Sequence, residues 1–400
     1  MTIPAAARPE RGAELDLRVD ALAFGGNGVA RMDGYVVFVR DALPGDRVRA
    51  VVTKRKRAYA EARAVEVLEP SPDRIEPLAA HPGAPWQVLP YERQLAVKAE
   101  QVDEALRRLG GLDGFVLDPM IAAEQTWRYR NKVELSFGAA PDGGLVAGFH
   151  APGSWEEVVG LDDCLLISER ANEAMRRTVA WARAEGLEPF DRRARTGLLR
   201  NLVVREGRRT GELQLRLVTG PGDVDLESLA AAAQVEGLFV TQTDAIAETT
   251  QGGRTTLVSG APTLGEELAG MHFAISPEAF FQTNTEMAER LYEVAADLAG
   301  LEGWERVFDL FSGIGTVGLV LAGRAGEVWG VEVVERAVAD AIANAQLNDV
   351  DNAQFFAGDV RLAMRELVER SGRPDVVVVD PPRAGLSQKI VRRIIEAAPK

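Results

Sequence analysis

The sequence predicts a multidomain α/β protein made of an N-terminal OB-like β-barrel, a central α+β domain and a C-terminal doubly wound sheet of the Rossmann type. The 400 residues, of which 46% are hydrophobic, suffice for two or three domains at about 150 residues each. Residues 13–70 alternate polar and apolar positions between glycine and proline turns, which is typical of a small five-stranded barrel. From about Gly270 onward strands and helices alternate, which indicates a parallel sheet with helices on both faces.

Changes in composition set the expected domain boundaries. A proline-rich connector from Pro70 to Pro90 leads into a segment with apolar residues near helical spacing, which ends at a Gly-Gly pair. Strand-like segments return from Arg128 to Thr219. The predicted divisions are a barrel at 9–70, a connector with a helix at 71–127, a central α+β domain at 128–269 and the C-terminal sheet at 270–400.

The composition as a whole excludes several classes of protein. The N-terminal MTIPAAARPERGAELDLRVD has no apolar core and does not resemble a signal peptide, and no stretch reaches the roughly 20 apolar residues of a membrane span. We therefore expect a cytoplasmic protein with no membrane partner. Cys164 is the only cysteine, which excludes an internal disulfide and a metal site built from several thiolates.

Charge is distributed unevenly along the chain, whose net charge is −14. Residues 1–80 carry 13 Lys and Arg against 12 Asp and Glu, whereas the remainder carries 33 against 48. Four basic residues of the first part are consecutive: Lys54, Arg55, Lys56 and Arg57. A positive stripe on an acidic protein suits contact with phosphates, although a solvated edge strand is an alternative explanation.

Residues 307–322, VFDLFSGIGTVGLVLA, have the pattern of a strand, a glycine-rich turn and the start of a helix. Gly313, Gly315 and Gly318 match G-x-G-x-x-G, so a dinucleotide and S-adenosylmethionine are both candidate ligands. Asp309 favours the second, because a carboxylate at the strand end repels a pyrophosphate and attracts the amine of a methionine moiety. We therefore predict an S-adenosylmethionine site.

Two further acids stand where the next strands are expected to end. Glu332, in VWGVEVV, can accept both hydroxyls of a ribose, and Asp359, in AQFFAGDV, would lie beside the adenine. Three acids at successive strand ends indicate a cofactor site more strongly than any one of them. The alternative is that they are helix caps and turn acids.

The turn DPPR, residues 380–383, follows a fourth predicted strand. It would place the carboxylate of Asp380 beside the transferable methyl group. Enzymes that methylate an exocyclic amine usually have an aromatic residue after the two prolines, where this chain has Arg383. The turn therefore argues against an amine substrate.

These segments together resemble the RNA uracil-5 methyltransferase family, class I enzymes that use S-adenosylmethionine on ribosomal or transfer RNA. The resemblance covers nearly the whole chain and is carried by YRNKVELSF, SPEAFFQTN, DLFSGIGTVGL, GVEVVERAVADAIANAQLN and DPPRAGL. In the barrel, GGNGVARMDGYVVFV and ALPGDRVRA resemble a TRAM domain, which implies RNA binding. By motif position the family's cofactor contacts fall on Gln282, Phe311, Thr316, Glu332, Asp359 and Asp380, with Thr316 where the family usually has Asn.

The predicted RNA contacts are the Lys54–Arg57 stripe together with Arg130 and Lys132 of YRNKVELSF, and Arg383 would lie near the target base or its phosphate. Thr283 and Glu286 form a T-x-x-E capping box, which predicts a helix from Asn284 and turns Phe281 and Gln282 into the cleft. The alternative is that FFQTN only packs a helix N-terminus.

The resemblance also implies a reaction that needs a nucleophilic cysteine and a general base, and these 400 residues contain neither at the family's motif positions. C5 of uracil is a poor nucleophile, so a thiolate must add at C6 before methyl transfer, and a base must then remove the C5 proton. In this family the cysteine follows the strand after DPxR and the base is a glutamate nearer the C-terminus, both beyond Lys400. We expect an incomplete C-terminal sheet and no turnover by these residues alone. A truncated enzyme, which we favour, and an inactive descendant both explain this.

Cys164 matches instead the last of four cysteines that hold an iron–sulfur cluster in some relatives. Where those relatives have C-G-G-C, this chain has His81, Pro82, Gly83 and Ala84. One cysteine and a histidine make a poor cluster site. We expect no iron–sulfur cluster and no metal, and a buried structural role for Cys164.

The expected function is therefore methylation of uridine C5 in structured RNA, ribosomal in preference to transfer RNA, by a monomer that splays the uridine into its cleft. One alternative is a methyltransferase for cytosine C5 or a base amine. A cytosine enzyme would be expected to carry a cysteine beside the Pro-Pro turn, and none is there. The other alternative is a non-catalytic RNA-binding protein.

Overall fold

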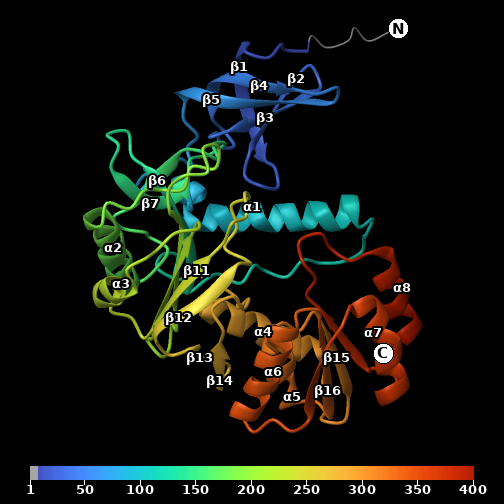
Figure 1. Cartoon of the computed structure of the whole chain (residues 1–400). Helices are drawn as coiled ribbons and strands as arrows, with labels where there is room; N and C mark the ends of the chain where they lie inside the picture. Colours follow the sequence, from blue (N-terminus) through green and yellow to red (C-terminus); the bar gives the residue numbers. More distant parts are fainter. Residues whose placement is uncertain (1–7) are drawn as a thin grey trace. The chain divides into compact units, whose positions relative to one another are not determined.

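The computed structural model describes residues 8–400 (Figure 1). The chain forms two compact units, one ending at Ala122 and the other running from Ala123 to Lys400. Over the described residues, no helix is both long and apolar enough to cross a membrane.

The N-terminal unit begins with a closed five-stranded barrel, which confirms the predicted OB-like fold. The strand order is β1-β2-β3-β5-β4, in which β3 and β5 run parallel and the other neighbours run antiparallel. The strands are β1 Glu14–Leu22, β2 Gly28–Met32, β3 Tyr35–Arg40, β4 Arg47–Arg55 and β5 Tyr59–Glu69. Alternate side chains point inward, so that Val37, Val39, Val48 and Ala50 are fully buried.

A helical segment follows the barrel in the same unit. Its elements are the 3-10 turn η1 Pro85–Val88, the helix α1 Tyr91–Glu104 and the π-helical turn η2 Ala105–Leu109. Val97 of α1 is buried in a small cluster with Leu22 and Leu43. The predicted helix is confirmed, but Val102 is 42% exposed and Leu109 89% exposed. Val97 is the one buried residue of α1, and Gln101, one turn further on, donates to the Leu22 and Ala23 carbonyls at 3.1 Å.

The second unit begins with a seven-stranded sheet in the order β12-β11-β10-β9-β6-β7-β8, in which only β10 and β11 are parallel neighbours. Its strands are β6 Lys132–Ala139, β7 Leu145–His150, β8 Val158–Gly160, β9 Leu199–Glu206, β10 Leu213–Thr219, β11 Gly237–Gln242 and β12 Arg254–Gly260. Helices α2 Glu169–Ala184 and α3 Leu226–Ala233 pack against it (Figure 1). One face is apolar, with Leu135, Leu202 and Leu217 in register, and the other carries buried polar side chains such as Arg205 and Arg216.

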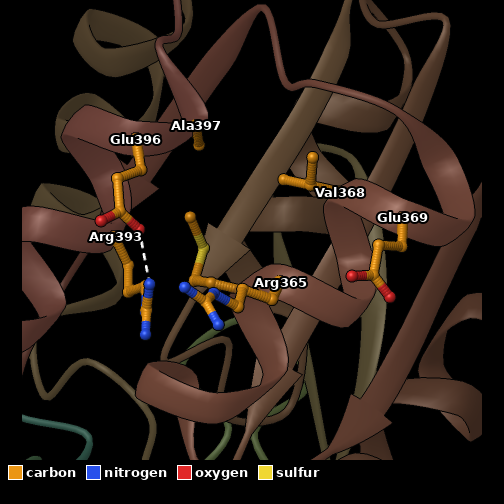
Figure 2. Close-up of a pocket in the computed structure, with 7 residues that line it drawn as sticks. Arg365, Val368, Glu369, Arg393, Glu396 and Ala397 are labelled. Atoms are coloured by element: carbon orange, nitrogen blue, oxygen red, sulfur yellow. Dashed lines mark hydrogen bonds and ion pairs between the residues drawn. The ribbon is translucent and has the colours of Figure 1, made fainter.

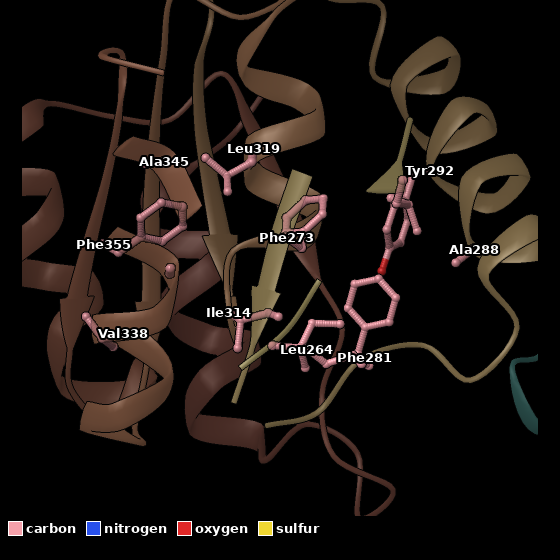
Figure 3. Packing of buried hydrophobic residues seen from close by; sticks show 13 residues of the cluster. Leu264, Phe273, Phe281, Ala288, Tyr292, Ile314, Leu319, Val338, Ala345 and Phe355 are labelled. Atoms are coloured by element: carbon pink, nitrogen blue, oxygen red, sulfur yellow. The ribbon is translucent and has the colours of Figure 1, made fainter. Parts of the chain in front are cut away.

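The rest of the unit contains the predicted doubly wound sheet, with four parallel strands in the order β17-β16-β15-β18. The strands are β15 Arg306–Leu310, β16 Glu327–Glu332, β17 Ala353–Ala357 and β18 Val376–Val379. The helices are α4 Thr285–Ala299, α5 Thr316–Ala322, α6 Glu335–Leu347, α7 Val360–Ser371 and α8 Gln388–Ala397. Helices α4, α5 and α6 share one core (Figure 3), and α7 and α8 pack with Phe308 and Leu310 in another.

A hairpin of β13 Leu264–Leu268 and β14 Met271–Ile275 precedes this sheet. Leu268 and Phe273 pack into the core that α4, α5 and α6 share. The predicted boundary between residues 269 and 270 therefore falls inside the hairpin.

Candidate functional site

The carboxyl ends of β15, β16 and β18 lie next to one another because these strands are parallel neighbours. Asp309 of β15 is in register with Gly330 of β16 and Val378 of β18. Glu332 is the last residue of β16, and Asp380 directly follows β18. Since neighbouring strands are about 4.8 Å apart, three of the predicted acids gather at one edge of the sheet.

Asp309 is the buried member of this group, with 2% of its surface exposed. Its Oδ2 accepts a hydrogen bond of 2.9 Å from the backbone N–H of Gly318. Burial, followed by the negative charges of Asp380 and Glu332, raises the pKa of Asp309 to about 7, although the hydrogen bond from Gly318 opposes the rise. A cation among the three carboxylates would favour their ionised forms, so the group suits a positively charged ligand.

The loop between β15 and α5 has a fixed and partly strained backbone. Phe311, Gly313 and Gly315 all have positive φ, of 69°, 55° and 84°. For Phe311 this conformation costs on the order of 1–3 kcal/mol, and such strain clusters at ligand sites. The Phe311 N–H donates to the Val331 carbonyl at 2.9 Å, and the Gly313 N–H donates to Glu332 Oε2 at 3.1 Å. The loop is therefore tied to β16 before any ligand binds.

Glu332 and Asp359 differ in what their carboxylates do. Glu332 accepts from the N–H of Val334 at 2.9 Å through Oε1, besides its bond to the glycine loop, so the carboxylate is oriented and each oxygen keeps a lone pair for a ligand. Asp359 is exposed, two residues beyond β17, and is the N-cap of α7, accepting from the Arg361 N–H at 2.8 Å. In this structure Asp359 therefore acts as a helix cap, which was the alternative explanation for the strand-end acids.

Thr316, the first residue of α5, places its hydroxyl 3.3 Å from Tyr292 Oη of α4. Burial, together with the nearby charges of Asp380 and Asp309, raises the pKa of Tyr292 to about 12, although the hydrogen bond with Thr316 opposes the rise. Tyr292 is therefore a protonated hydroxyl beside the acids. Sequence reasoning missed it, because a tyrosine on an amphipathic helix belongs to no motif.

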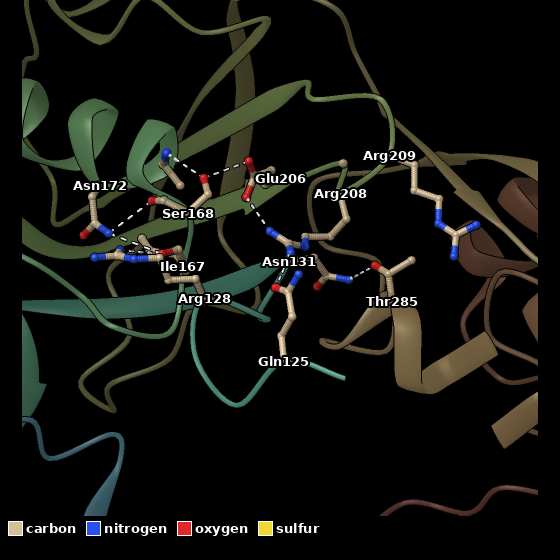
Figure 4. A network of polar contacts seen from close by, with 12 residues as sticks. Gln125, Arg128, Asn131, Ile167, Ser168, Asn172, Glu206, Arg208, Arg209 and Thr285 are labelled. Carbon is tan, nitrogen blue, oxygen red and sulfur yellow. Dashed lines mark hydrogen bonds and ion pairs between the residues drawn. The ribbon is translucent and has the colours of Figure 1, made fainter. Parts of the chain in front are cut away.

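Gln282 lies in the segment between β14 and α4, which the central sheet holds in place (Figure 4). Asn131, only 4% exposed, donates through Nδ2 to the Gln282 carbonyl at 2.8 Å and to Thr285 Oγ1 at 2.9 Å. Its backbone N–H donates to the Thr283 carbonyl at 2.8 Å. Asn131 therefore fixes the backbone on both sides of the residue predicted to contact the cofactor.

Arg205 holds the preceding part of the same segment. Its guanidinium donates to the Ala279 carbonyl at 2.6 Å and to the Ser276 carbonyl at 3.2 Å. Burial, followed by the charge of Arg216, lowers the pKa of Arg205 to about 10, so it remains a cation at neutral pH. Nothing in the sequence marks Arg205, because its partners are some 70 residues further along the chain.

The helix after this segment is capped differently from the prediction. Asn284 is the N-cap of α4 and accepts from the Met287 N–H at 3.1 Å, so the predicted capping box of Thr283 and Glu286 is wrong. Asn is the stronger of two adjacent N-cap candidates. Phe281 does not face a cleft either: it is buried beside Phe273, with ring centroids 6.0 Å apart (Figure 3).

The two predicted RNA contacts of the central domain are not free surface cations. Lys132 is largely buried and lies 2.6 Å from Glu134 Oε1, and burial, followed by the charge of Arg205, lowers its pKa. Arg130 is half-buried beside the Tyr129 ring, and its Nε is shielded from solvent without a hydrogen-bond partner among the described residues. The burial of Lys132 argues against a direct phosphate contact.

Asp380 and Arg383 are both exposed, and within residues 8–400 neither side chain has a hydrogen-bond or ion-pair partner. The DPPR turn is thus open to a ligand. A separate pocket of about 270 Å³ lies between α7 and α8 (Figure 2), lined by Met364, Arg365, Val368, Glu369, Arg393, Glu396 and Ala397. None of the predicted site residues lines it.

Cys164 is buried, as predicted, with none of its surface exposed. Its N–H donates to Asn172 Oδ1 at 2.7 Å, and its carbonyl accepts from Asn172 Nδ2 at 3.1 Å. Burial raises the pKa of its thiol. In the part of the chain that the structure describes, no three His, Cys, Asp or Glu side chains are grouped as metal ligands would be.

Comparisons with known proteins follow the same division of the chain. The TRAM domain model matches residues 8–65, and the tRNA (uracil-5-)-methyltransferase model matches residues 264–397. An uncharacterized RNA methyltransferase of Clostridium tetani is 34% identical, over 96% of this chain and 87% of its own length. Another from Porphyromonas gingivalis is 36% identical, over 96% of this chain and 89% of its own.

A solved structure also matches along most of its length. It is that of Pyrococcus abyssi tRNA (uracil-54, C5)-methyltransferase in complex with S-adenosyl-L-homocysteine. It is 26% identical with a TM-score of 0.78, and the match covers 96% of this chain and 87% of that one.

Matches of this extent place the chain among the RNA methyltransferases, the class to which its fold and strand-end acids pointed. Within that class it belongs to the tRNA (uracil-5-)-methyltransferase family, with a TRAM domain as its barrel. The predicted family is confirmed.

Proposed function

We propose that the protein transfers a methyl group from S-adenosylmethionine to C5 of a uridine in RNA. The observation that carries the proposal is the buried Asp309 between Glu332 and Asp380, at the edge of the sheet where this fold binds ligands. Asp309 and Asp380 suit the ammonium and sulfonium charges of this cofactor, and the three carboxylates together repel a dinucleotide pyrophosphate. We further propose that the substrate is ribosomal RNA and that the protein acts as a monomer in the cytoplasm.

The proposed cofactor contacts are those of the sequence prediction: Gln282, Asp309, Phe311, Gly313, Gly315, Thr316, Glu332, Asp359 and Asp380. When bound, S-adenosylmethionine supplies an electrophilic methyl group. Asp309 and Asp380 stabilise positive charge, and Glu332, held by two backbone N–H groups, accepts from the ribose. The tethered glycine loop and the segment fixed by Asn131 keep these groups in place without reorganisation.

Arg383 is proposed to contact the target base or its phosphate, because its exposed guanidinium sits three residues from Asp380. The thiolate that uridine chemistry needs does not come from Cys164, which is buried. Residues 8–400 are therefore assigned cofactor binding and the orientation of the uridine.

The test uses the complete product of the gene with unmodified RNA and methyl-labelled S-adenosylmethionine, followed by nucleoside analysis. Label in 5-methyluridine is the expected result, and parallel reactions with ribosomal and transfer RNA transcripts identify the substrate. Label only in cytidine or adenosine derivatives contradicts the proposal. Cofactor binding with no label in any RNA supports the non-catalytic alternative.

Replacing Asn131 with Ala should weaken S-adenosylhomocysteine binding about tenfold and destabilise the fold by about 1–3 kcal/mol, because two buried hydrogen bonds to the 282–285 segment are lost. Titration calorimetry and urea unfolding measure the two effects.

Asn352→Ala is the matched control for this prediction. Asn352 also donates two hydrogen bonds, to the Ala322 and Ala325 carbonyls, but it precedes β17 and so lies at the opposite end of the sheet. This variant should lose stability and keep its affinity for the ligand. Equal loss of affinity in both variants would mean that Asn131 acts only through overall stability.

A further inference from the structure

Two hydroxyl groups meet beside the acidic edge of the parallel sheet. Tyr292 Oη of α4 lies 3.3 Å from the Oγ1 of Thr316, the first residue of α5. Two residues further along α5, the Gly318 N–H donates to Asp309 Oδ2 at 2.9 Å. The Asp309 carboxylate is therefore bonded to the helical turn that carries the Thr316 hydroxyl. The negative charges of Asp380 and Asp309 also act on Tyr292, so both hydroxyls border the acids of the proposed cofactor site.

The protein leaves part of the hydrogen-bonding capacity of this pair unused. A hydroxyl group donates one hydrogen, so two hydroxyls bonded to each other have one hydrogen left for a third group. Among residues 8–400, neither oxygen has another hydrogen-bond partner. The ring of Tyr292 packs in the core that α4, α5 and α6 share, which fixes where its hydroxyl lies (Figure 3). Because the pKa of Tyr292 is raised to about 12, this hydroxyl keeps its proton at neutral pH.

The methionine moiety of S-adenosylmethionine carries two opposite charges on one carbon atom. Its ammonium group suits Asp309 and Asp380, but the same acids repel its carboxylate. A hydroxyl group is neutral and donates a hydrogen bond, so hydroxyls beside the acids can bind the carboxylate without repelling the ammonium. The other predicted contacts in the loop before α5, which are Phe311, Gly313 and Gly315, have no polar side chain. The two hydroxyls are therefore the side-chain donors next to the proposed ammonium position.

We propose that Tyr292 is a further cofactor-binding residue, whose hydroxyl acts with that of Thr316 to bind the carboxylate of the methionine moiety. One hydroxyl donates to the other, and the remaining hydrogen is donated to a carboxylate oxygen of the ligand. The site then recognises a complete amino-acid group, with acids for the amine and hydroxyls for the carboxylate. The proposal rests on the proposed function, to which it adds the residue that distinguishes the cofactor from analogues without a carboxylate.

The experiment compares two ligands by titration calorimetry at pH 8: S-adenosylhomocysteine and its decarboxylated analogue, which keeps the amine and lacks the carboxylate. Tyr292→Phe removes only the hydroxyl, so it should weaken S-adenosylhomocysteine about tenfold and change the affinity for the analogue less than twofold. Asp309→Asn should weaken both ligands, because both carry the amine. Thr316→Val should act as Tyr292→Phe does. The double variant should lose little more affinity than either single variant, because the two hydroxyls act as one unit.

Tyr35→Phe is the matched control, since Tyr35 is a buried tyrosine of the barrel whose hydroxyl donates to the Lys56 carbonyl at 2.8 Å. In urea unfolding it should lose no less stability than Tyr292→Phe, and it should leave both affinities unchanged. Equal losses for the two ligands in Tyr292→Phe would overturn the proposal, and so would no loss for either. Absence of S-adenosylhomocysteine binding by the unaltered protein would contradict the proposed function as well. Label outside 5-methyluridine contradicts the proposed function alone, because these affinities do not depend on the RNA.

Discussion

Replacing Asp309 with Asn should stabilise the ligand-free protein at pH 8 and weaken its binding of S-adenosylhomocysteine at the same pH. Asn keeps an oxygen that can accept from the Gly318 N–H, so the glycine loop retains its 2.9 Å hydrogen bond. The substitution removes only the negative charge of Asp309. That residue is 2% exposed and lies near the carboxylates of Glu332 and Asp380.

The direction of the stability effect follows from the pKa. In the folded protein the pKa of Asp309 is raised to about 7, from an ordinary value of 3.8. The folded state therefore holds the proton more tightly, and stability falls as pH rises from about 4 through 7. Above pH 7 the ionised Asp309 lowers the free energy of unfolding by at most about 4 kcal/mol. The Asn side chain carries no charge, so the variant does not lose this stability. Thermal unfolding of Asp309→Asn against the unaltered protein should diverge across this window and coincide near pH 4.

The direction of the binding effect is opposite. At pH 8 the Asp309 carboxylate can pair with the ammonium of the ligand, so its loss should weaken S-adenosylhomocysteine about tenfold to a hundredfold. At pH 6 Asp309 is mostly protonated, and the difference should shrink to a fewfold. 5′-Methylthioadenosine, which lacks the amino-acid group, should bind both proteins alike.

Asp297→Asn provides the control for this prediction, since that carboxylate is exposed and, among the residues that the structure describes, pairs only with Arg324. It should change neither the stability profile nor the affinity. A loss of affinity in Asp309→Asn that is the same at pH 6 and pH 8, or the same for 5′-methylthioadenosine, would contradict the assigned role.

The features that the sequence predicted correctly are those fixed by local pattern. Strand and helix periods predicted the barrel and the parallel sheet. The sequence placed Asp309, Glu332 and Asp359 at successive strand ends and Asp380 after a fourth strand, and in the structure Asp309, Glu332 and Asp380 lie at the ends of neighbouring strands while Asp359 caps α7. In a parallel sheet this convergence needs no further information, because all strands end at the same edge. The glycine loop was recognisable for the same reason: its turn and its strand are contiguous.

The features that sequence reasoning missed depend on residues far apart in the chain. Asn131 and Arg205 position a segment about 150 and 70 residues away, and the partner of Thr316 lies on another helix. The sequence also did not show that Lys54, the first cation of the basic stripe, is neutralised by Glu61. The two residues form an ion pair because the register of β4 and β5 places them opposite each other. The cap of α4 was a choice between two adjacent good candidates, which local preference ranks only weakly.

Replacing Gly315 with Ala should lower the free energy of unfolding by about 2–4 kcal/mol and abolish tight cofactor binding. The backbone there has φ of +84°, where any side chain is strained. A Cβ would also lie 2.9 Å from Phe355 Cζ and 3.1 Å from Ala341 Cβ, both in the core under the loop. Urea unfolding and calorimetric titration with S-adenosylhomocysteine measure the two effects.

Gly313→Ala separates backbone strain from crowding in the same loop. Gly313 also has a positive φ, of +55°, but a Cβ there would have no atom within 4 Å. Its substitution should cost only the strain of the left-handed conformation, about 1–2 kcal/mol. If the two alanine variants lose equal stability, contact with Phe355 is not the cause of the larger effect.

A double-mutant cycle tests that cause directly. Phe355 crowds both Gly315 and Gly330, because a Cβ at either glycine would collide with its ring. The ring therefore sets how closely β16, the glycine loop and β17 can approach one another. Phe355→Leu alone should cost about 1–1.5 kcal/mol, as the loss of a ring from a packed core. In the Gly315→Ala variant, Phe355→Leu should lower the free energy of unfolding by less than it does alone, or raise it. The interaction free energy between the two substitutions should be about 1 kcal/mol or more. Additive losses would show that the strained φ, and not the ring beneath the loop, requires glycine at this position.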